Sequence, residues 1–464
     1  MPMGHDTAPK HFIKAAIAGN THCGCMLIGV VLILLHLGIA LGIDRRNLVS
    51  PVNALLVLVW VMVFRATELA VFGESIYPEW VRPYMSATVL LETSLVIGVF
   101  LICFYTSYFS IQPNLLSQHL HTYIYPEVKQ PRALILVMAI VGAACAIQFL
   151  SQLNDVTDII LHKTREEVFE GNGLLIAGIS FLPAAILGSL MFSRTKLQLV
   201  LVSLLLFLTT SAVYLPLGQR GNIFTFVIIA VVVCSIKLGT LSLKWTVTIG
   251  ALILFCLEMA VIWRTTLRYG YEGELSDLFI VANALDGLDR GEFDALAGLV
   301  AYNSSIDFDS WWAFIEQLIP RTLMPSKRTY TAVSYLVNRE ITGDDEAGFT
   351  ASIVGTLYGQ GGWFGIAVCG VILGVLMRLL QCWFITQTRD PNGELMRGLA
   401  VVFVFFLVRN GDLTNVIIML IANLAGVSLL MAALFVLPAW RRTWEHLFMV
   451  SRGRIGLGKT LTQK

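Results

Sequence analysis

The sequence predicts an all-α integral membrane protein that carries one large loop on the outer side of the membrane. Composition is the first observation, because 56% of the 464 residues are hydrophobic and only 14% are charged, whereas a soluble domain is about 25% charged. The second is a series of about eleven apolar runs (ten to twelve), each close to the roughly 20 residues that a helix needs to cross a bilayer. The third is the interval 265–350, which contains no such run.

The predicted spans fall into two groups on either side of this interval. Residues 1–264 form an N-terminal transmembrane bundle of about eight spans, and residues 351–440 contribute about three more before a basic tail at 441–464. The predicted spans are 24–42, 52–72, 85–107, 132–151, 173–192, 197–217, 222–237, 244–263, 352–383, 396–410 and 414–438.

Lysine and arginine residues in short loops predict the orientation, since cytoplasmic loops are enriched in them. With the basic tail in the cytoplasm, counting backwards also places Arg194, Lys237 and Arg389 on the cytoplasmic side. The outer segments are then the loops 153–172, 215–221 and 264–351 and the turn near Asn410.

The sequence gives no reason to expect nucleic acid, a metal or a cofactor. The formal net charge is only +1, which does not suggest a polyanionic partner. The chain contains no P-loop, no GxSxG elbow, no HExxH and no CxxC. Most of the eight cysteines lie in predicted spans, so neither a disulfide framework nor a metal site is predicted.

The large outer loop is acidic and rich in aromatic residues. Its stretch DFDSWWAFIEQL places Trp311 and Trp312 beside carboxylates, which suits sugar binding because aromatic rings stack on flat sugar faces. The same residues, with Phe314, are also typical of an amphipathic helix anchored at the membrane surface, where tryptophan is enriched. Both interpretations are open at the level of the sequence.

Basic residues near the outer ends of predicted spans are the most informative polar residues, because outer loops are usually poor in them. Arg220 lies in the short turn LGQRG, between Gly218 and Gly221. A guanidinium group matches phosphate oxygens bidentately, so several arginines at one membrane depth predict a shared anionic ligand. Taken singly, each could instead be an anchor at the water boundary. The others are Arg165, Arg264, Arg268, Arg321, Lys327 and Arg409.

Charged residues also fall within predicted spans. Arg65 and Glu68 lie three residues apart in VFRATELAV and can neutralise each other on one helix face. Glu92 and Glu258 lie in other spans. Charges at such positions are costly and usually face the interior of a helix bundle or a water-filled path. They therefore indicate either a structural ion pair or the route of a transported solute.

Four stretches of the chain are distinctive: LGQRGNIF with Arg220, IPRTLMPSKR with Arg321, GFTASIVGTLYGQGGWFG with Tyr358, and LVRNGDLTN with Arg409 and Asp412. Together they resemble the O-antigen polymerase family, whose members join the oligosaccharide repeat units of bacterial envelope polysaccharides. The similarity extends over residues 132–438.

This resemblance implies a membrane glycosyltransferase with a GT-C-like helical fold in the bacterial inner membrane. Such an enzyme uses no nucleotide-sugar donor and no cofactor. It transfers the growing glycan from undecaprenyl diphosphate onto a new lipid-linked repeat unit and releases undecaprenyl diphosphate, for lipopolysaccharide O-antigen or a related surface polysaccharide. Its expected partners are the undecaprenyl-diphosphate-linked oligosaccharide, the lipid bilayer and a protein that regulates chain length.

The residues expected to carry this reaction act on the diphosphate leaving group. Fixed cations aimed at charge that develops in a transition state are often the largest catalytic term. Gly218 and Gly221 have no side chain and would let a phosphate approach the backbone closely. The expected catalytic residues are Arg220, Arg321, Arg409 and Asp412, and the expected substrate-binding residues are Arg165, Arg264, Arg268, Lys327, Tyr358, Gly218 and Gly221.

The sequence does not single out a general base for the attacking sugar hydroxyl. The candidates are Asp412, Glu166, Glu167 and His162. The related ligases are expected to use a histidine in the large outer loop, and the interval 265–350 contains no histidine. This departure favours a polymerase over a ligase.

The alternative from another class is a secondary transporter or flippase of a lipid-linked or anionic solute. The interval 265–350 would then be a lid. A purely structural membrane scaffold, whose arginines are all anchors, is a further alternative. The path of a transporter would be lined by Arg65, Glu68, Glu92 and Glu258.

Overall fold

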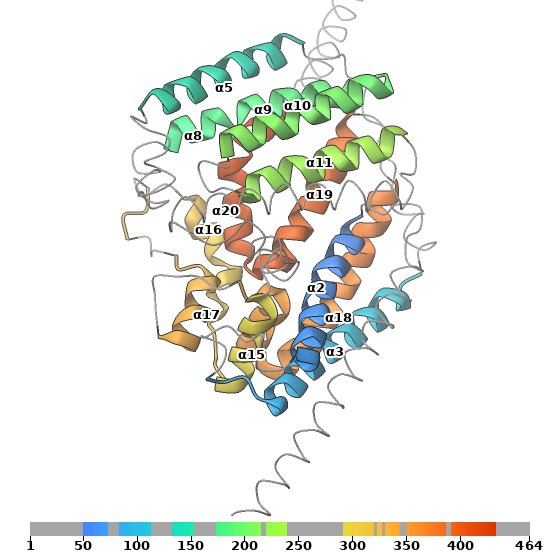
Figure 1. The fold of residues 1–464 in the computed structure, drawn as a ribbon, viewed down its shortest axis with the longest axis vertical. Helices are drawn as coiled ribbons and strands as arrows, with labels where there is room; N and C mark the ends of the chain where they lie inside the picture. The colour runs from blue at the N-terminus through green and yellow to red at the C-terminus, as the bar shows by residue number, and fades with distance from the viewer. Residues whose placement is uncertain are drawn as a thin grey trace, which may run out of the picture.

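The described part of the chain is entirely helical in its regular elements (Figure 1). The computed structural model describes residues 50–72, 83–112, 132–152, 173–214, 220–238, 291–319, 323–326, 330–343, 350–386 and 391–432. The helices are α2 (Pro51–Phe72), α3 (Ala87–Ser110), α5 (Arg132–Gln152), α8 (Gly173–Ile179), α9 (Phe181–Met191), α10 (Lys196–Tyr214), α11 (Arg220–Leu238), α15 (Gly291–Tyr302), η2 (Phe308–Trp311), α16 (Ala313–Leu318), α17 (Val333–Thr342), α18 (Ser352–Thr386), α19 (Pro391–Asn410) and α20 (Leu413–Asn423).

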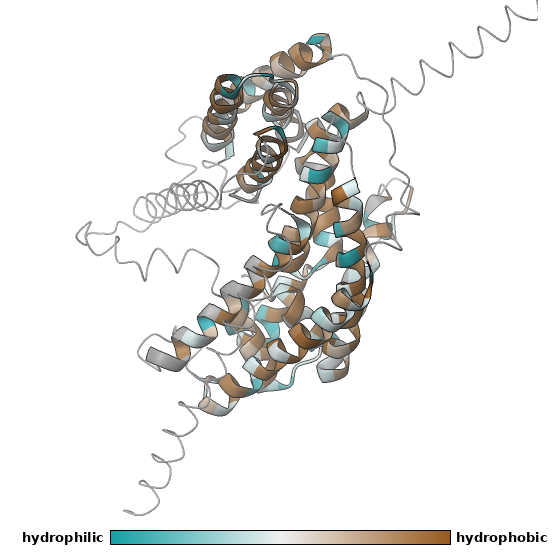
Figure 2. Cartoon of the chain, turned by 90° about the vertical axis from the view of Figure 1, so that its right-hand side faces the viewer, coloured by the Kyte–Doolittle hydropathy of each residue, from teal (hydrophilic) through white to brown (hydrophobic). Residues whose placement is uncertain are grey.

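Six of the described helices, namely α3, α5, α10, α11, α18 and α19, are long and apolar enough to cross a membrane. The chain is therefore an all-α, multi-pass membrane protein. Hydrophobic residues predominate along these helices (Figure 2). The spans predicted at 24–42 and 244–263 lie outside the described residues.

Two hydrophobic cores share one helix, α19. The first core joins α2, α3, α15, α17 and α18, and it includes Val404 and Val408 of α19. The second joins α5, α9, α10 and α11, and it includes Leu395, Val402 and Phe406 of α19. Figure 1 shows α19 running between these two groups of helices. Because both sides of α19 are buried, its ends are fixed relative to both groups.

Helices α3 and α18 run in the same direction with their backbones in contact. A Cβ atom added to Gly374 would overlap the carbonyl oxygen of Phe104. One added to Gly370, a turn earlier, would lie 3.2 Å from the carbonyl oxygen of Phe100, also a turn earlier. Small residues spaced four apart allow this close approach in membrane helices. The parallel pairing agrees with the predicted orientation, in which both spans run inward.

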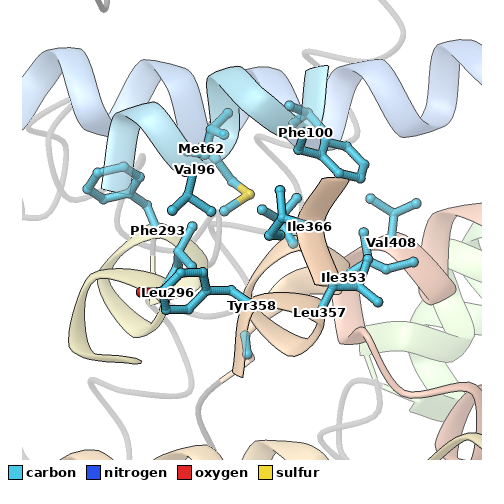
Figure 3. Close-up of a cluster of buried hydrophobic side chains, with 14 of the residues drawn as sticks. Met62, Val96, Phe100, Phe293, Leu296, Ile353, Leu357, Tyr358, Ile366 and Val408 are labelled. Atoms are coloured by element: carbon cyan, nitrogen blue, oxygen red, sulfur yellow. The ribbon is translucent and has the colours of Figure 1, made fainter. Parts of the chain in front are cut away.

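The span predicted at 352–383 consists of two helical parts that meet at Gly362. This residue has φ 55° and ψ −147°, a conformation that is essentially restricted to glycine. The two parts fold toward each other, since Gly365 packs on the carbonyl oxygen of Leu357 and Ile366 is buried beside Leu357 (Figure 3). The part after the kink is about 36 Å long at the helical rise, which is enough to cross the bilayer.

The span predicted at 173–192 is divided at Ser180 into α8 and α9. Proline is tolerated in the first turn of a helix but not in its interior, and α9 accordingly begins at Phe181, two residues before Pro183. The Ser180 hydroxyl accepts a hydrogen bond of 3.0 Å from the backbone N–H of Gly426. The break therefore serves as a contact point for the C-terminal part of the chain.

The span predicted at 414–438 is also interrupted. It begins as α20, but this helix ends at Asn423, and residues 425–432 form a separate helical stretch after a turn at Leu424. Hydropathy did not reveal this break because apolar residues continue through it.

Helices α11 and α19 run antiparallel. The Nζ atom of Lys237, in the last turn of α11, lies 3.3 Å from the Oε1 atom of Glu394, in the first turn of α19. The first turn of α11, which begins at Arg220, and the last turn of α19, which contains Arg409, therefore lie together at the opposite side of the bundle.

Gly374→Ala should destabilise the protein, because the added methyl group has to displace backbone of α3. Overpacking of this kind costs about 1–3 kcal/mol. The thermal unfolding midpoint of the detergent-solubilised protein measures the loss. The matched control is Gly361→Ala, whose added Cβ meets nothing within 4 Å. Equal losses in both variants would contradict the close α3–α18 contact.

Candidate functional site

Helix α15 places two acidic residues inside the first core. Its residues from Glu292 to Val300 are all buried, as expected of a short helix surrounded by other helices. Glu292 and Asp294 lie in its first turn, where the helix dipole favours negative charge. Each of these two carboxylates faces an arginine from a different helix.

Asp294 forms a two-point ion pair with Arg65 of α2. The Arg65 Nε atom donates to Oδ1 at 3.3 Å, and Nη2 donates to Oδ2 at 3.0 Å. The two side chains are only 3% and 2% exposed. The hydroxyl of Tyr84 donates to the backbone carbonyl of Asp294 at 3.1 Å. Burial raises the pKa of Tyr84, and the nearby charge of Asp294 raises it further. The pair ties α2 to α15.

This partner differs from the one that the sequence suggested for Arg65. Spacing predicted neutralisation by Glu68 on the same helix, whereas the structure gives Arg65 a carboxylate on α15. The side chain of Glu68 lies outside the described atoms.

Glu292 forms a looser ion pair with Arg409 at the end of α19. The Arg409 Nε atom lies 3.9 Å from the Glu292 Oε1 atom. The glutamate side chain is 4% exposed and the arginine side chain is 27% exposed. The glutamate therefore lies in the core, and the arginine lies closer to the surface. Burial raises the pKa of Glu292 well above its ordinary value. Arg409 also lies in the last turn of its helix, where a cation is favoured.

The turn after Arg409 can accommodate only glycine at position 411. Gly411 has φ 63°, and a Cβ atom there would overlap the hydroxyl of Thr356 and the carbonyl oxygen of Ser352. Both are buried residues in the first turns of α18. The glycine of the LVRNGDLTN motif therefore lets the end of α19 pack directly against α18.

Asp412 is a buried helix cap. Its Oδ1 atom accepts the backbone N–H of Asn415 at 2.9 Å, which caps α20, and its Oδ2 atom accepts the N–H of Val333 at 3.1 Å, at the start of α17. Tyr330 lies beside the same carboxylate. Burial raises the pKa of Asp412 while these hydrogen bonds lower it.

The first turn of α11 lies beside the last turn of α19. Arg220 begins α11, and a Cβ atom added to its neighbour Gly221 would lie 3.5 Å from the ring of Phe406. Phe406 precedes Arg409 by three residues, which is nearly one helical turn. The structure thus brings the backbones at Arg220 and Arg409 close together, while the Arg220 side chain lies outside the described atoms.

Tyr358 is the other expected binding residue that the structure describes. It lies in α18, where its ring meets that of Trp363 edge-on at 6.3 Å between centroids. The remaining candidates lie outside the described residues: Arg165, Gly218, Arg264, Arg268, Arg321 and Lys327, and the possible bases His162, Glu166 and Glu167.

Sequence reasoning missed Glu292 and Asp294 because they lie in the interval interpreted as an outer loop. The stretch GEFDALAGLVAY carried the signal, since acidic residues directly before an apolar run are typical of a helix N-terminus. We call Arg65, Glu292, Asp294, Arg409 and Asp412 the polar cluster. Among the described residues, no group of three or more His, Cys, Asp or Glu side chains is placed to hold a metal ion.

Comparison of the chain with protein-family models, with curated proteins and with solved structures finds no match. The function therefore has to be inferred from the residues and their geometry.

The Arg65–Asp294 pair should show strong coupling in a double-mutant cycle. Asp294→Leu leaves an uncompensated buried arginine, and breaking a buried pair costs about 3–5 kcal/mol. Replacing both partners, as Arg65→Met with Asp294→Leu, should restore much of this stability, since paired apolar replacements are often neutral. Thermal unfolding of the four proteins measures the coupling. Additive losses would show that the two side chains do not depend on each other.

Glu292→Gln should make the protein increasingly more stable than wild type as pH rises. The raised pKa of Glu292 means that the folded state holds the proton more tightly than the unfolded state. Wild-type stability therefore falls as pH rises from the ordinary glutamate value of 4.5 through the folded pKa, and glutamine has no proton to lose. Unfolding midpoints from acidic to neutral pH test this. A difference that is constant with pH would contradict it.

Proposed function

We propose that this chain is a polysaccharide polymerase that joins undecaprenyl-diphosphate-linked repeat units at the outer face of the bacterial inner membrane. The observation that carries the proposal is the juxtaposition of Arg409, at the end of α19, with the first turn of α11, which begins at Arg220. A GT-C-like arrangement of about eleven spans would surround this site.

This juxtaposition suits a diphosphate for two reasons. The N-terminus of a long helix attracts anions through its free N–H groups and its dipole, and α11 presents such an end next to Arg409. The Arg409 guanidinium is partly exposed, and its Nε atom lies 3.9 Å from the buried Glu292 carboxylate. Guanidinium groups bind phosphate oxygens bidentately.

The proposed reaction is a glycosyl transfer. A hydroxyl oxygen of the new repeat unit bonds to the anomeric carbon of the growing glycan, and the bond from that carbon to the diphosphate oxygen breaks. The diphosphate leaves with the electron pair, and the hydroxyl proton passes to a base. Arg220 and Arg409, with Arg321 as a further member, stabilise the charge that develops on the leaving group.

The described residues add one candidate for the base. Asp412 uses both carboxylate oxygens to accept backbone N–H groups, which suits a capping role better than proton transfer. Glu292 lies beside Arg409, and burial raises the pKa of this carboxyl group above its ordinary value. Glu292 therefore joins Glu166, Glu167 and His162 as a candidate.

The transporter alternative has less support from the polar cluster. It needs Arg65 in a path that a solute can enter, and Arg65 is instead almost fully buried in a two-point pair with Asp294. A fixed ion pair that ties two helices together is the simpler account of this intramembrane charge.

Arg409→Ala should abolish polymerisation in cells. A strain that lacks this protein should carry surface glycan of single repeat units, and wild type should restore the ladder of longer chains while Arg409→Ala and Arg220→Ala do not. Gel electrophoresis of the surface glycan, at equal protein level in the membrane, is the measurement.

The matched control is Arg194→Ala, because Arg194 is an exposed arginine in the turn between α9 and α10. This variant should restore a normal ladder. A normal ladder with Arg409→Ala and Arg220→Ala would refute the arginine site. Loss of all surface glycan, rather than of long chains alone, in the strain that lacks this protein would favour a flippase.

A further inference from the structure

The segment that follows α15 exposes a row of large apolar side chains. Phe308 of η2 is 54% exposed, Trp312 is 70% exposed, Ile315 of α16 is 57% exposed and Ile319 is 37% exposed. They recur every three or four residues through η2, the turn at Trp312 and α16, up to Ile319 directly after that helix. We call these four residues the apolar row. Isolated exposed apolar residues need no explanation, but several large ones close together in the chain mark an interaction surface.

Other residues of this segment are hydrogen-bonded to α18. The indole N–H of Trp311 donates to the side-chain oxygen of Gln360 at 2.7 Å, and the amide of Gln360 donates to the carbonyl oxygen of Asp307 at 3.0 Å. The backbone N–H of Ile306 donates to the carbonyl oxygen of Gly359 at 2.8 Å. These three hydrogen bonds hold the segment beside Gly359 and Gln360 of α18.

This position on α18 lies at the start of the part of the helix that can cross the membrane. Gly359 and Gln360 lie just before the kink at Gly362, and Trp363 and Phe364 follow it with 41% and 79% exposure. Aromatic residues of this kind gather where a membrane helix meets the headgroup region. The apolar row is thus held beside the membrane boundary.

We propose that the apolar row rests in the headgroup region of the lipid bilayer and anchors the α15–α18 assembly there. The partner is lipid because the row is held at the end of helices whose exposed apolar surfaces already face lipid. Amphipathic segments that lie in the membrane plane bury an apolar face of this composition in the headgroup region. The proposal concerns an interaction surface, and it does not depend on the proposed enzymatic function. It also separates the roles of two adjacent tryptophans: Trp311 binds the protein, and Trp312 binds the membrane.

The test uses the full-length protein in nanodiscs made of phosphatidylglycerol and dibrominated phosphatidylcholine. Bromine quenches tryptophan emission only at short range, so the difference between wild type and Trp312→Phe isolates the Trp312 component. This component should fall several-fold with bromines placed near the headgroup, less with bromines near the chain end, and little with iodide in the buffer. The matched control, Trp311→Phe, should give a component that is quenched less by the brominated lipid.

Two results would overturn the proposal. Strong quenching by iodide without quenching by brominated lipid would place Trp312 in water. Quenching by neither agent would mean that a second copy of the chain or another segment covers the row. Trp312→Phe preserves an aromatic side chain at an exposed position, so the variant is expected to fold and both results remain interpretable.

Discussion

The buried ion pair between Arg65 and Asp294 is the constraint on which the arrangement of the candidate functional site depends. Removing both charges from water carries a large desolvation cost, and only a well-formed geometry recovers it. The two-point contact supplies that geometry, and it holds α15 in the middle of the first core. Once α15 is fixed there, Glu292 two residues earlier is fixed as well, beside Arg409.

Around this constraint, glycines set how closely the helices approach. Gly411 allows the end of α19 to meet α18, and Gly374 allows α18 to meet α3. The GFTASIVGTLYGQGGWFG stretch carries part of the family resemblance, and its Tyr358 is an expected substrate-binding residue. In the structure several of its glycines have packing roles: Gly359 lies against Ile306, Gly362 forms the kink, and Gly365 lies against Leu357. These roles account for much of its composition without a ligand.

Hydropathy predicted the helical membrane architecture and the positions of most described spans, because lipid solvation imposes long apolar helices. It could not predict the breaks at Ser180, Gly362 and Leu424, since these depend on local backbone geometry inside apolar sequence. Positive-inside counting placed Arg220 and Arg409 at one end of the bundle, and the antiparallel α11–α19 pair agrees. The partner of Arg65 could not be found from spacing, because Asp294 lies far away in the sequence and comes from an interval that lacks a span.

The antiparallel pair α11–α19 is held unequally along its length. One end carries the Lys237–Glu394 ion pair, and near the middle of the pair a Cβ atom added to Gly398 would overlap the side chain of Ile229. At the other end, Gly221 and Phe406 meet with ordinary van der Waals spacing. The α11–α19 pair is therefore packed more tightly at its middle than beside Arg220 and Arg409, so the close-packed middle of the pair supports the proposed anion site from within the bundle.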